Sequence, residues 1–365
     1  MKCLNPIFKK VSTSIRIKDK VSDISFRDFL KRPQSYLEDD TTKYVEIPCG
    51  KCVFCLQQKV NEWSLRIKHE LMFFRTGMFL TLTYNNSSVP RTFTSQPKIS
   101  NNHIFYTDTT LVKAHLQKFF KRLRYYLDKE KRKVKYYACG EYGDKTDRAH
   151  YHVILLGMKS WSFQDRMLIK KCWKYGYIHF GDASVSSGRY VAKYCNKVHE
   201  SFDYKKRYLE QGREAPFKLS SIGFGKRYVE QEKDNIYNNL YIQNNKFQMS
   251  IPRTYYRWLC KMFSDFKDKI KEKTQQFRET QFFNLLKHYS SRLTQTHLED
   301  IFNTIKRITQ LNIVLKNNFQ EEFNVYDLSN YPRLYEMYHI SLENKANELK
   351  EKEKQKISEK KFAIF

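Results

Sequence analysis

The sequence predicts an α+β fold centred on an antiparallel β-sheet, and two observations support this. Between residues 78 and 180, strand and helix patterns follow one another in the order strand, helix, strand, strand, helix, strand. The strand segments are short apolar runs rich in aromatic and β-branched residues, whereas the helical segments space their apolar residues three or four apart. This order is that of the ferredoxin-like or RRM-like split unit. In that topology the third strand lies in the middle of the sheet.

The elements of this unit can be placed along the chain. Strands are predicted at 78–84, 134–140, 150–156 and 175–180, and helices at 111–132, at 161–174 and from Ser187 onward. The helix at 111–132 is amphipathic and basic, with lysines and arginines around an apolar face. Residues 85–109 are predicted to form a long polar loop. The later segment FKLSSIGFGKRY is either a loop whose backbone approaches phosphates or a plain surface turn.

Regions of different character flank this unit. Residues 1–46 are polar and mixed, which predicts an extended arm with little regular structure, and 49–75 read as a Cys-rich turn leading into a helix. From about residue 253 glycine vanishes and the spacing predicts several helices, which end in a solvated or disordered charged tail. We therefore expect three parts: an N-terminal Cys-rich arm with helix at 1–75, a core at 76–230 and a helical C-terminal region at 231–365.

The charge of the chain points to a polyanionic partner. The 365 residues include 67 Lys and Arg against 39 Asp and Glu, a formal net charge of +28, and 16% are aromatic. A balance this basic is typical of nucleic-acid-binding proteins, and aromatic rings among cations suit stacking on unpaired bases. A merely basic surface is the plainer alternative.

Compartment and membrane contact can also be judged from the sequence. We find no run of about 18 apolar residues and no signal peptide. We therefore expect no membrane contact and a location in a reducing cytoplasm, where the eight cysteines would not form disulfides.

The stretch GEYGDKTDRAHYHVIL, residues 140–155, contains a candidate metal site. Side chains alternate along a strand, so His150 and His152 share one face and can reach one ion. Glu141 ends the preceding strand, and the short turn brings it back beside His150. Two imidazoles and a carboxylate suit a divalent ion such as Mn²⁺ or Mg²⁺. The same stretch resembles a phosphate-binding P-loop but departs from its G-x₄-G-K-[ST] spacing, and we reject that reading.

The helix SGRYVAKYCNK, residues 187–197, contains two candidate nucleophiles. Tyr190 and Tyr194 are four residues apart and lie on one helical face, with Lys193 near it. A phenol with a pKa of about 10 needs a nearby cation to attack as phenolate. The alternative is a tyrosine stripe packed as core.

Taken together, FLTLTY, GEYG…RAHYHVILLG and YVAKYCNK resemble the three ordered motifs of the HUH-superfamily rolling-circle replication initiators. The closest resemblance is to the replication initiators of microviruses, the gokushovirus type above all. PCGKCVFC and FKLSSIGFGKRY resemble the same phage group. The resemblance covers residues 46–230, and the paired tyrosines are typical of its two-nucleophile branch.

This resemblance implies an activity and partners. The family cuts single-stranded DNA at an origin, forms a 5′-phosphotyrosine and later rejoins the strand into a circle. Applied to this chain, it implies Tyr190 and Tyr194 as nucleophiles, Lys193 as a positioning or proton-handling residue, and Mn²⁺ or Mg²⁺ on Glu141, His150 and His152. It also implies a phage origin as substrate, a host helicase and DNA polymerase as partners, and the cytoplasm of a bacterial host as location.

A cysteine cluster gives a second metal hypothesis. Cys49, Cys52 and Cys55 follow a C-x₂-C-x₂-C pattern close to zinc spacing. Cys3 would be a fourth ligand if the arm folds back, and His69 is the poorer candidate. Structural zinc and free buried thiols are both consistent with the pattern.

Alternatives from other functional classes are also open. One is a non-catalytic protein that binds single-stranded nucleic acid, and another is a structural protein that packages DNA through its charge. Only an enzyme of the first kind would become covalently attached to DNA.

Overall fold

The computed structural model divides the chain into two compact units, Leu56–Asp234 and Met1–Cys55 with Asn235–Phe365. The residues that the structure describes are 3–12, 24–25, 42–92, 97–100, 103–106, 109–143, 147–197, 208, 210–318, 325–327 and 330–362. Asp144 and Lys145, part of the rejected P-loop, lie outside the described residues.

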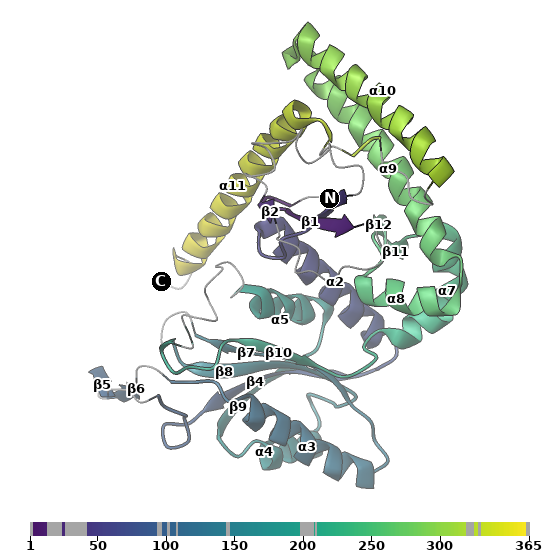
Figure 1. The fold of residues 1–365 in the computed structure, drawn as a ribbon. Coiled ribbons are helices and arrows are strands. Elements are labelled where there is room, and N and C mark those ends of the chain that lie inside the picture. The colour runs from purple at the N-terminus through teal and green to yellow at the C-terminus, as the bar shows by residue number, and fades with distance from the viewer. Residues whose placement is uncertain are drawn as a thin grey trace. The chain divides into compact units, whose positions relative to one another are not determined.

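The unit Leu56–Asp234, called the core unit below, is built on a five-stranded sheet in the order β10-β7-β8-β4-β9 (Figure 1). All neighbouring strands in it are antiparallel. The bounds are Gly77–Tyr84 for β4, Lys135–Tyr142 for β7, Ala149–Leu156 for β8, Gly176–Asp182 for β9 and Phe217–Ser220 for β10. Strands β4, β7, β8 and β9 have the order of the ferredoxin-like unit, so the predicted fold class is confirmed. Strand β8, which carries both histidines, is the central strand.

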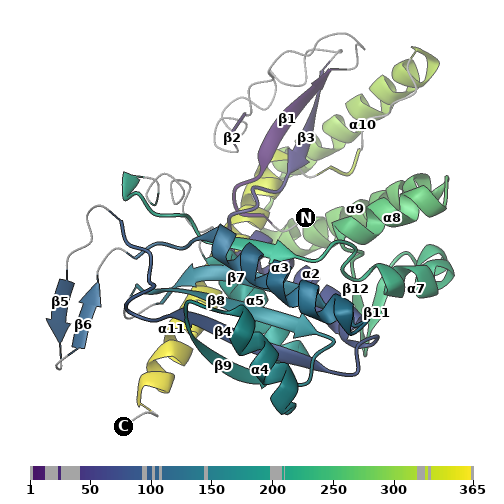
Figure 2. The same cartoon turned by 90° about the horizontal axis from the view of Figure 1, so that it is seen from below.

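Two helical layers cover this sheet. Helices α3 (Lys113–Lys129) and α4 (Phe163–Cys172) cover one face, as Figures 1 and 2 show. Their core is apolar, with Phe119, Leu123 and Ile169 against Val153 of β8. The other face packs against α2 (Val53–Leu71) and α5 (Val185–Lys197).

The alternation of β8 divides its side chains between the two faces, as predicted. Tyr151, Val153 and Leu155 enter the core under α3 and α4, whereas Ile154 and Leu156 pack on the side of α2 and α5. His150 and His152 belong to the second side because side chains two residues apart on a strand share a face. The histidines therefore face the helix that carries the tyrosine pair.

Two predictions of loop structure in the core unit are wrong. Within the polar loop expected at 85–109, Pro97–Ser100 (β5) and His103–Tyr106 (β6) pair as a hairpin. Phe217–Ser220 (β10) extends the sheet beside β7. These segments have four residues each, too few for a periodic pattern to stand out from a polar background.

The turn between β10 and α7 (Lys226–Asn239) is a structural element. The carbonyl of Phe224 accepts hydrogen bonds from Arg66 of α2. The backbone N–H of Gly225 donates to the buried carboxylate of Glu70, which also pairs with Lys135 Nζ at 2.6 Å. Because the backbone of this turn is used to fix α2 to the sheet, these groups support the turn interpretation and not the phosphate-binding loop.

The other unit joins the two ends of the chain. Ile7–Ser12 (β1) pairs with Ile24–Ser25 (β2) and with Thr42–Ile47 (β3), so the arm has strands where little regular structure was expected. The register runs from Ile7 opposite Ile47 to Ser12 opposite Thr42. A short hairpin follows the core unit, with strands Ile242–Asn244 (β11) and Phe247–Met249 (β12).

Helices make up most of this unit beyond the hairpin, as predicted. They are α8 (Arg253–Met262), α9 (Phe266–Tyr289), α10 (Gln295–Asn318) and α11 (Pro332–Phe362), with a 3₁₀ turn at Ser290–Arg292. Phe282, Ile301 and Leu334 pack α9, α10 and α11 together. The charged tail continues α11 as a helix, which corrects the expectation of a solvated or disordered run. None of the helices in the described part of the chain has the length and apolar character needed to cross a bilayer.

Candidate metal centre and tyrosine pair

Strand register brings Glu141, His150 and His152 together. Glu141 lies directly opposite His150 across β7 and β8, and Cys139 lies opposite His152. Glu141 Oε1 is 3.0 Å from the Nε2 atom of His150 and 3.0 Å from the Nε2 atom of His152. The three side chains thus direct one oxygen and two nitrogens at a common point, and each can offer one ligand atom to a cation.

The outer nitrogen of each imidazole is fixed by a hydrogen bond. His150 Nδ1 lies 3.0 Å from the carbonyl oxygen of Arg148, to which it donates. His152 Nδ1 lies 3.1 Å from the hydroxyl of Thr81 on β4. Such partners hold the ring orientation and the tautomer of metal-ligating histidines. They leave both Nε2 atoms to face the common point.

Burial makes this cluster electrostatically unusual. Glu141 is 4% exposed and His152 6% exposed. Burial acts to raise the pKa of Glu141, but the hydrogen bonds and charges of His150 and His152 outweigh it and hold that pKa below its usual value. A buried carboxylate that stays ionised needs a positive partner. A divalent cation held by the same three side chains would supply that charge.

The tyrosine pair lies next to this cluster. The ring centroids of Tyr190 and Tyr194 on α5 are 4.4 Å apart, and they lie 5.4 and 5.7 Å from that of His152. Tyr190 is 42% exposed, and the buried residues between the two tyrosines are Val191 and Ala192. The interpretation of the tyrosines as a purely structural stripe is therefore weakened, because the apolar packing of α5 uses their neighbours. Lys193 is exposed on the same helix.

The pKa of Tyr190 is raised above its ordinary value. Burial is the main cause, followed by the hydrogen bond and charge of Tyr194 and by the negative charge of Glu141. Without a cation the phenol therefore holds its proton. A cation at the Glu141 cluster would oppose this effect, because a nearby positive charge favours phenolate.

Gly188 sets how closely α5 approaches α2. It is buried, and a Cβ atom added to it would lie 2.6 Å from Cγ2 of Ile67, which is itself fully buried. Real Cβ contacts are longer than this, so only glycine allows the observed spacing. The sequence offered no sign of this contact, since the two residues are far apart along the chain.

One row of side chains continues the site across the sheet. Register places Glu141, His150, Thr83 and Tyr177 opposite one another across β7, β8, β4 and β9. Tyr177 is 72% exposed and lines an open cavity of about 550 Å³. The other lining residues are Thr83, Tyr84, Asn85, Asn86, Ser87 and Arg148. Sequence reasoning missed this cavity, whose one signal was an aromatic residue on the predicted last strand.

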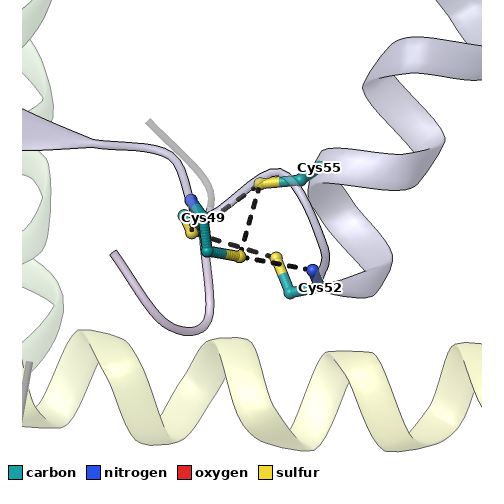
Figure 3. A group of neighbouring side chains, drawn as sticks. Cys49, Cys52 and Cys55 are labelled. Atoms are coloured by element: carbon teal, nitrogen blue, oxygen red, sulfur yellow. Dashed lines mark hydrogen bonds between the residues drawn. The ribbon is translucent and has the colours of Figure 1, made fainter. Parts of the chain in front are cut away.

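The four predicted cysteines form a second cluster, in the other unit. Figure 3 shows Cys49, Cys52 and Cys55 directed toward one another at the start of α2. Cys3 joins them, with its sulfur 3.7 Å from that of Cys55 and 3.9 Å from that of Cys52. His69, the weaker candidate, is instead stacked on Tyr228 at a centroid distance of 3.4 Å.

The fold and site define an α+β protein with a ferredoxin-like sheet and a candidate metal centre of two histidines and a glutamate beside paired tyrosines. Residues 77–199 match the family model that describes replication-associated proteins of the ORF2 type. These residues contain the predicted metal ligands and both tyrosines.

Three curated proteins resemble the chain. Replication-associated protein ORF2 of Spiroplasma virus 4 is 27% identical over 302 residues, which cover 76% of this chain and 87% of that protein. Replication-associated protein VP4 of Bdellovibrio phage phiMH2K is 26% identical over 257 residues, covering 64% of this chain and 75% of that protein. Replication-associated protein ORF4 of Chlamydia phage 1 is 30% identical over 169 residues, covering 41% and 38%.

The resemblance stated from the motifs is confirmed: the chain is related to the replication-associated proteins of microvirus-type phages. No solved structure matches it significantly.

Proposed function

We propose that this protein initiates rolling-circle replication of a microvirus-type phage as an HUH endonuclease and strand transferase acting on single-stranded DNA. One observation carries the proposal. The Nε2 atoms of His150 and His152 converge on the Glu141 carboxylate, and the paired rings of Tyr190 and Tyr194 lie beside them. A potential ligand set for a cation is thus placed next to two potential nucleophiles.

The donor set fits a divalent cation. A buried carboxylate that stays ionised and two imidazoles with fixed outer nitrogens form a preorganised ligand set with positions open to water or phosphate. Oxygen donors of a phosphate beside such a set favour Mn²⁺ or Mg²⁺. When bound, the ion would supply charge stabilisation to the phosphate at which the strand is cut.

The chain's own residues account for the bonds that change. The oxygen of one tyrosine, Tyr190 or Tyr194, attacks the phosphorus atom, and a Tyr O–P bond forms as the P–O3′ bond breaks. The phenolic proton passes to solvent and the departing 3′ oxygen becomes a hydroxyl. The products are a 5′-phosphotyrosine and a free 3′-hydroxyl, from which a host polymerase extends while a host helicase separates the strands.

A pair of tyrosines allows the cycle to close. After one round of synthesis, the second phenol cuts the regenerated origin in the same way. The new 3′-hydroxyl then attacks the first phosphotyrosine, restores the phosphodiester and frees the first phenol. Bond energy is conserved in each exchange, so rejoining needs no ATP. Lys193, exposed on α5 next to Tyr194, is proposed to position the phosphate.

A covalent adduct tests this proposal. Single-stranded oligonucleotides tiled across the phage genome that carries the gene are incubated with the full chain and Mn²⁺, then boiled in detergent. A label at the 3′ end should travel with the protein and a label at the 5′ end should not, because tyrosine holds the 5′ phosphate. EDTA should prevent the reaction.

Variants assign the nucleophiles. Tyr190→Phe with Tyr194→Phe should abolish the adduct while leaving DNA binding nearly unchanged. Tyr125→Phe, which alters an exposed tyrosine on α3, should behave as the unmodified protein. An adduct in the double variant would contradict the nucleophile assignment. Salt-dependent binding with no adduct in the unmodified chain would instead favour a non-catalytic binding or packaging protein.

A further inference from the structure

The cluster of Cys3, Cys49, Cys52 and Cys55 lies outside the site described above. We propose that these four thiolates bind one structural Zn²⁺ ion, which fixes the N-terminal segment to the start of α2 and to α11. The inference does not depend on the proposed nicking activity.

The sulfur positions match a tetrahedral zinc site. With Zn–S bonds of about 2.3 Å, the edges of the tetrahedron are about 3.8 Å long. The sulfur atoms of Cys3 and Cys55 are 3.7 Å apart, those of Cys3 and Cys52 3.9 Å, and those of Cys49 and Cys55 4.0 Å. All four sulfurs lie within 4.8 Å of one another. These separations leave room for one ion at the centre.

Other states of the cysteines explain the geometry less well. A disulfide needs sulfurs about 2.05 Å apart, and each of the four cysteines is free. Neutral thiols have no reason to gather four at a time. Thiolates do, when a cation holds them. Four cysteine ligands leave no open position, which is typical of structural and not catalytic zinc.

Backbone N–H groups point at these sulfurs. Leu4 N–H donates to Cys52 Sγ at 3.3 Å, and Cys49 N–H donates to Cys3 Sγ at 3.3 Å. The N–H groups of Lys51 and Cys52 both donate to Cys49 Sγ. Hydrogen bonds of this kind stabilise the negative charge of metal-bound thiolates. Gly50, with φ of +71°, provides the left-handed turn that points this backbone inward.

The site connects three segments that are distant in sequence. Leu4 donates to the sulfur of Cys52 through its N–H, and its carbonyl accepts a hydrogen bond from Nε2 of His339 on α11. His339 is 9% exposed and its Nδ1 lies 3.5 Å from Glu343 Oε1. An ion at the cluster therefore holds the N-terminal end against both α2 and α11. Because the ligands come together only in the folded chain, metal binding should stabilise this unit.

Metal content and cobalt spectra test the proposal on the full chain. Protein purified without chelator should contain one zinc per chain at the cysteines. A variant with His150→Ala and His152→Ala should keep it, and Cys49→Ser with Cys52→Ser should lose it. Cys260→Ser is the matched control, since this free cysteine lies outside the cluster. Replacement of zinc by Co²⁺ should give the near-ultraviolet absorption of thiolate-to-cobalt charge transfer.

A second measurement covers variants that fail to fold. The unmodified protein is titrated with a mercurial while a chromophoric indicator records zinc, and amide exchange of β1 and β3 is followed. Zinc should leave as the cluster thiols react, and exchange in Ile7–Ser12 should accelerate. The proposal is overturned if the folded protein contains no zinc and takes up Co²⁺ without a thiolate band, or if the cysteines bind iron.

Discussion

Glu141 and His150 stand directly opposite each other on β7 and β8, and their carboxylate oxygen and Nε2 atom lie 3.0 Å apart. Nine residues separate them in sequence, so the strand pairing and the turn together determine the contact. His152 reaches the same oxygen from two residues further along β8. A cation site at this position is therefore built into the centre of the sheet, on paired strands that hold the three side chains in place.

The first prediction concerns the imidazole ligands. His152→Ala should lower the rate of adduct formation on the order of 100-fold, because charge stabilisation by a metal supplies several kcal/mol. Mn²⁺ affinity, measured by calorimetry or electron spin resonance, should fall in parallel. His288→Ala, on the exposed face of α9, should change neither quantity. Full activity of His152→Ala in the presence of EDTA would remove the metal from the mechanism.

Part of this site was predictable from local patterns. Alternation placed His150 and His152 on one face, and four-residue spacing placed Tyr190 and Tyr194 on one helical face, as the structure has them. These predictions needed only the periodicity of one element. The order of the elements then gave the sheet, with β8 at its centre.

Contacts between distant segments were not predictable in this way. The approach of Gly188 to Ile67 and the use of Gly225 by Glu70 depend on how α2 packs on the sheet, which no local period records. Strand β1 was missed because its Lys9 and Lys10 make it look like a polar arm, and pairing with β3 overrides that local character.

The second prediction concerns the outer partner of His152. Thr81→Val keeps the shape of the side chain and removes the hydroxyl that lies 3.1 Å from His152 Nδ1. Metal affinity should fall about tenfold, since partners of this kind fix the ligand ring. Thr83→Val, two residues further along the same face of β4, should leave metal affinity unchanged in a calorimetric titration. Equal affinity in both variants would show that the hydroxyl does not orient the ring.

The third prediction concerns the buried pair of Glu70 and Lys135. Lys135→Met leaves the Glu70 carboxylate, whose side chain is fully buried, without its cation. The free energy of unfolding should fall by about 3 kcal/mol in urea titrations, as is typical when one partner of a buried pair is removed. Lys226→Met breaks an exposed pair with Glu230 and should cost less than about 1 kcal/mol. Similar losses in the two variants would mean that Glu70 is not dependent on Lys135.

The fourth prediction concerns the path of the DNA strand. Tyr177 lies in the same cross-strand row as His150 and is exposed beside the open cavity. Stacking of one base on an aromatic ring is worth about 1–3 kcal/mol. Tyr177→Ala should therefore weaken binding of single-stranded DNA about tenfold, measured by fluorescence anisotropy at fixed salt.

A matched control exists for this prediction. Phe163 on α4 is 73% exposed, and its helix packs on the opposite face of the sheet. Phe163→Ala should leave DNA affinity unchanged. If both substitutions weaken binding equally, the strand does not follow the row that contains His150 and Tyr177.

The fifth prediction concerns Gly188. Gly188→Ala places a methyl group where Ile67 already stands, so α5 must move away from α2 by roughly 1 Å, and such a displacement of a nucleophile costs on the order of 100-fold in rate. Stability should also fall, by about 2 kcal/mol, because the packing is already tight. Adding Ile67→Ala removes the atoms that clash, and adduct formation should recover in the double variant although Ile67→Ala alone is destabilising. Recovery of the rate without recovery of stability would show that Gly188 acts by placing the tyrosines; a double variant as slow as Gly188→Ala would show that the spacing of the two helices does not set their position.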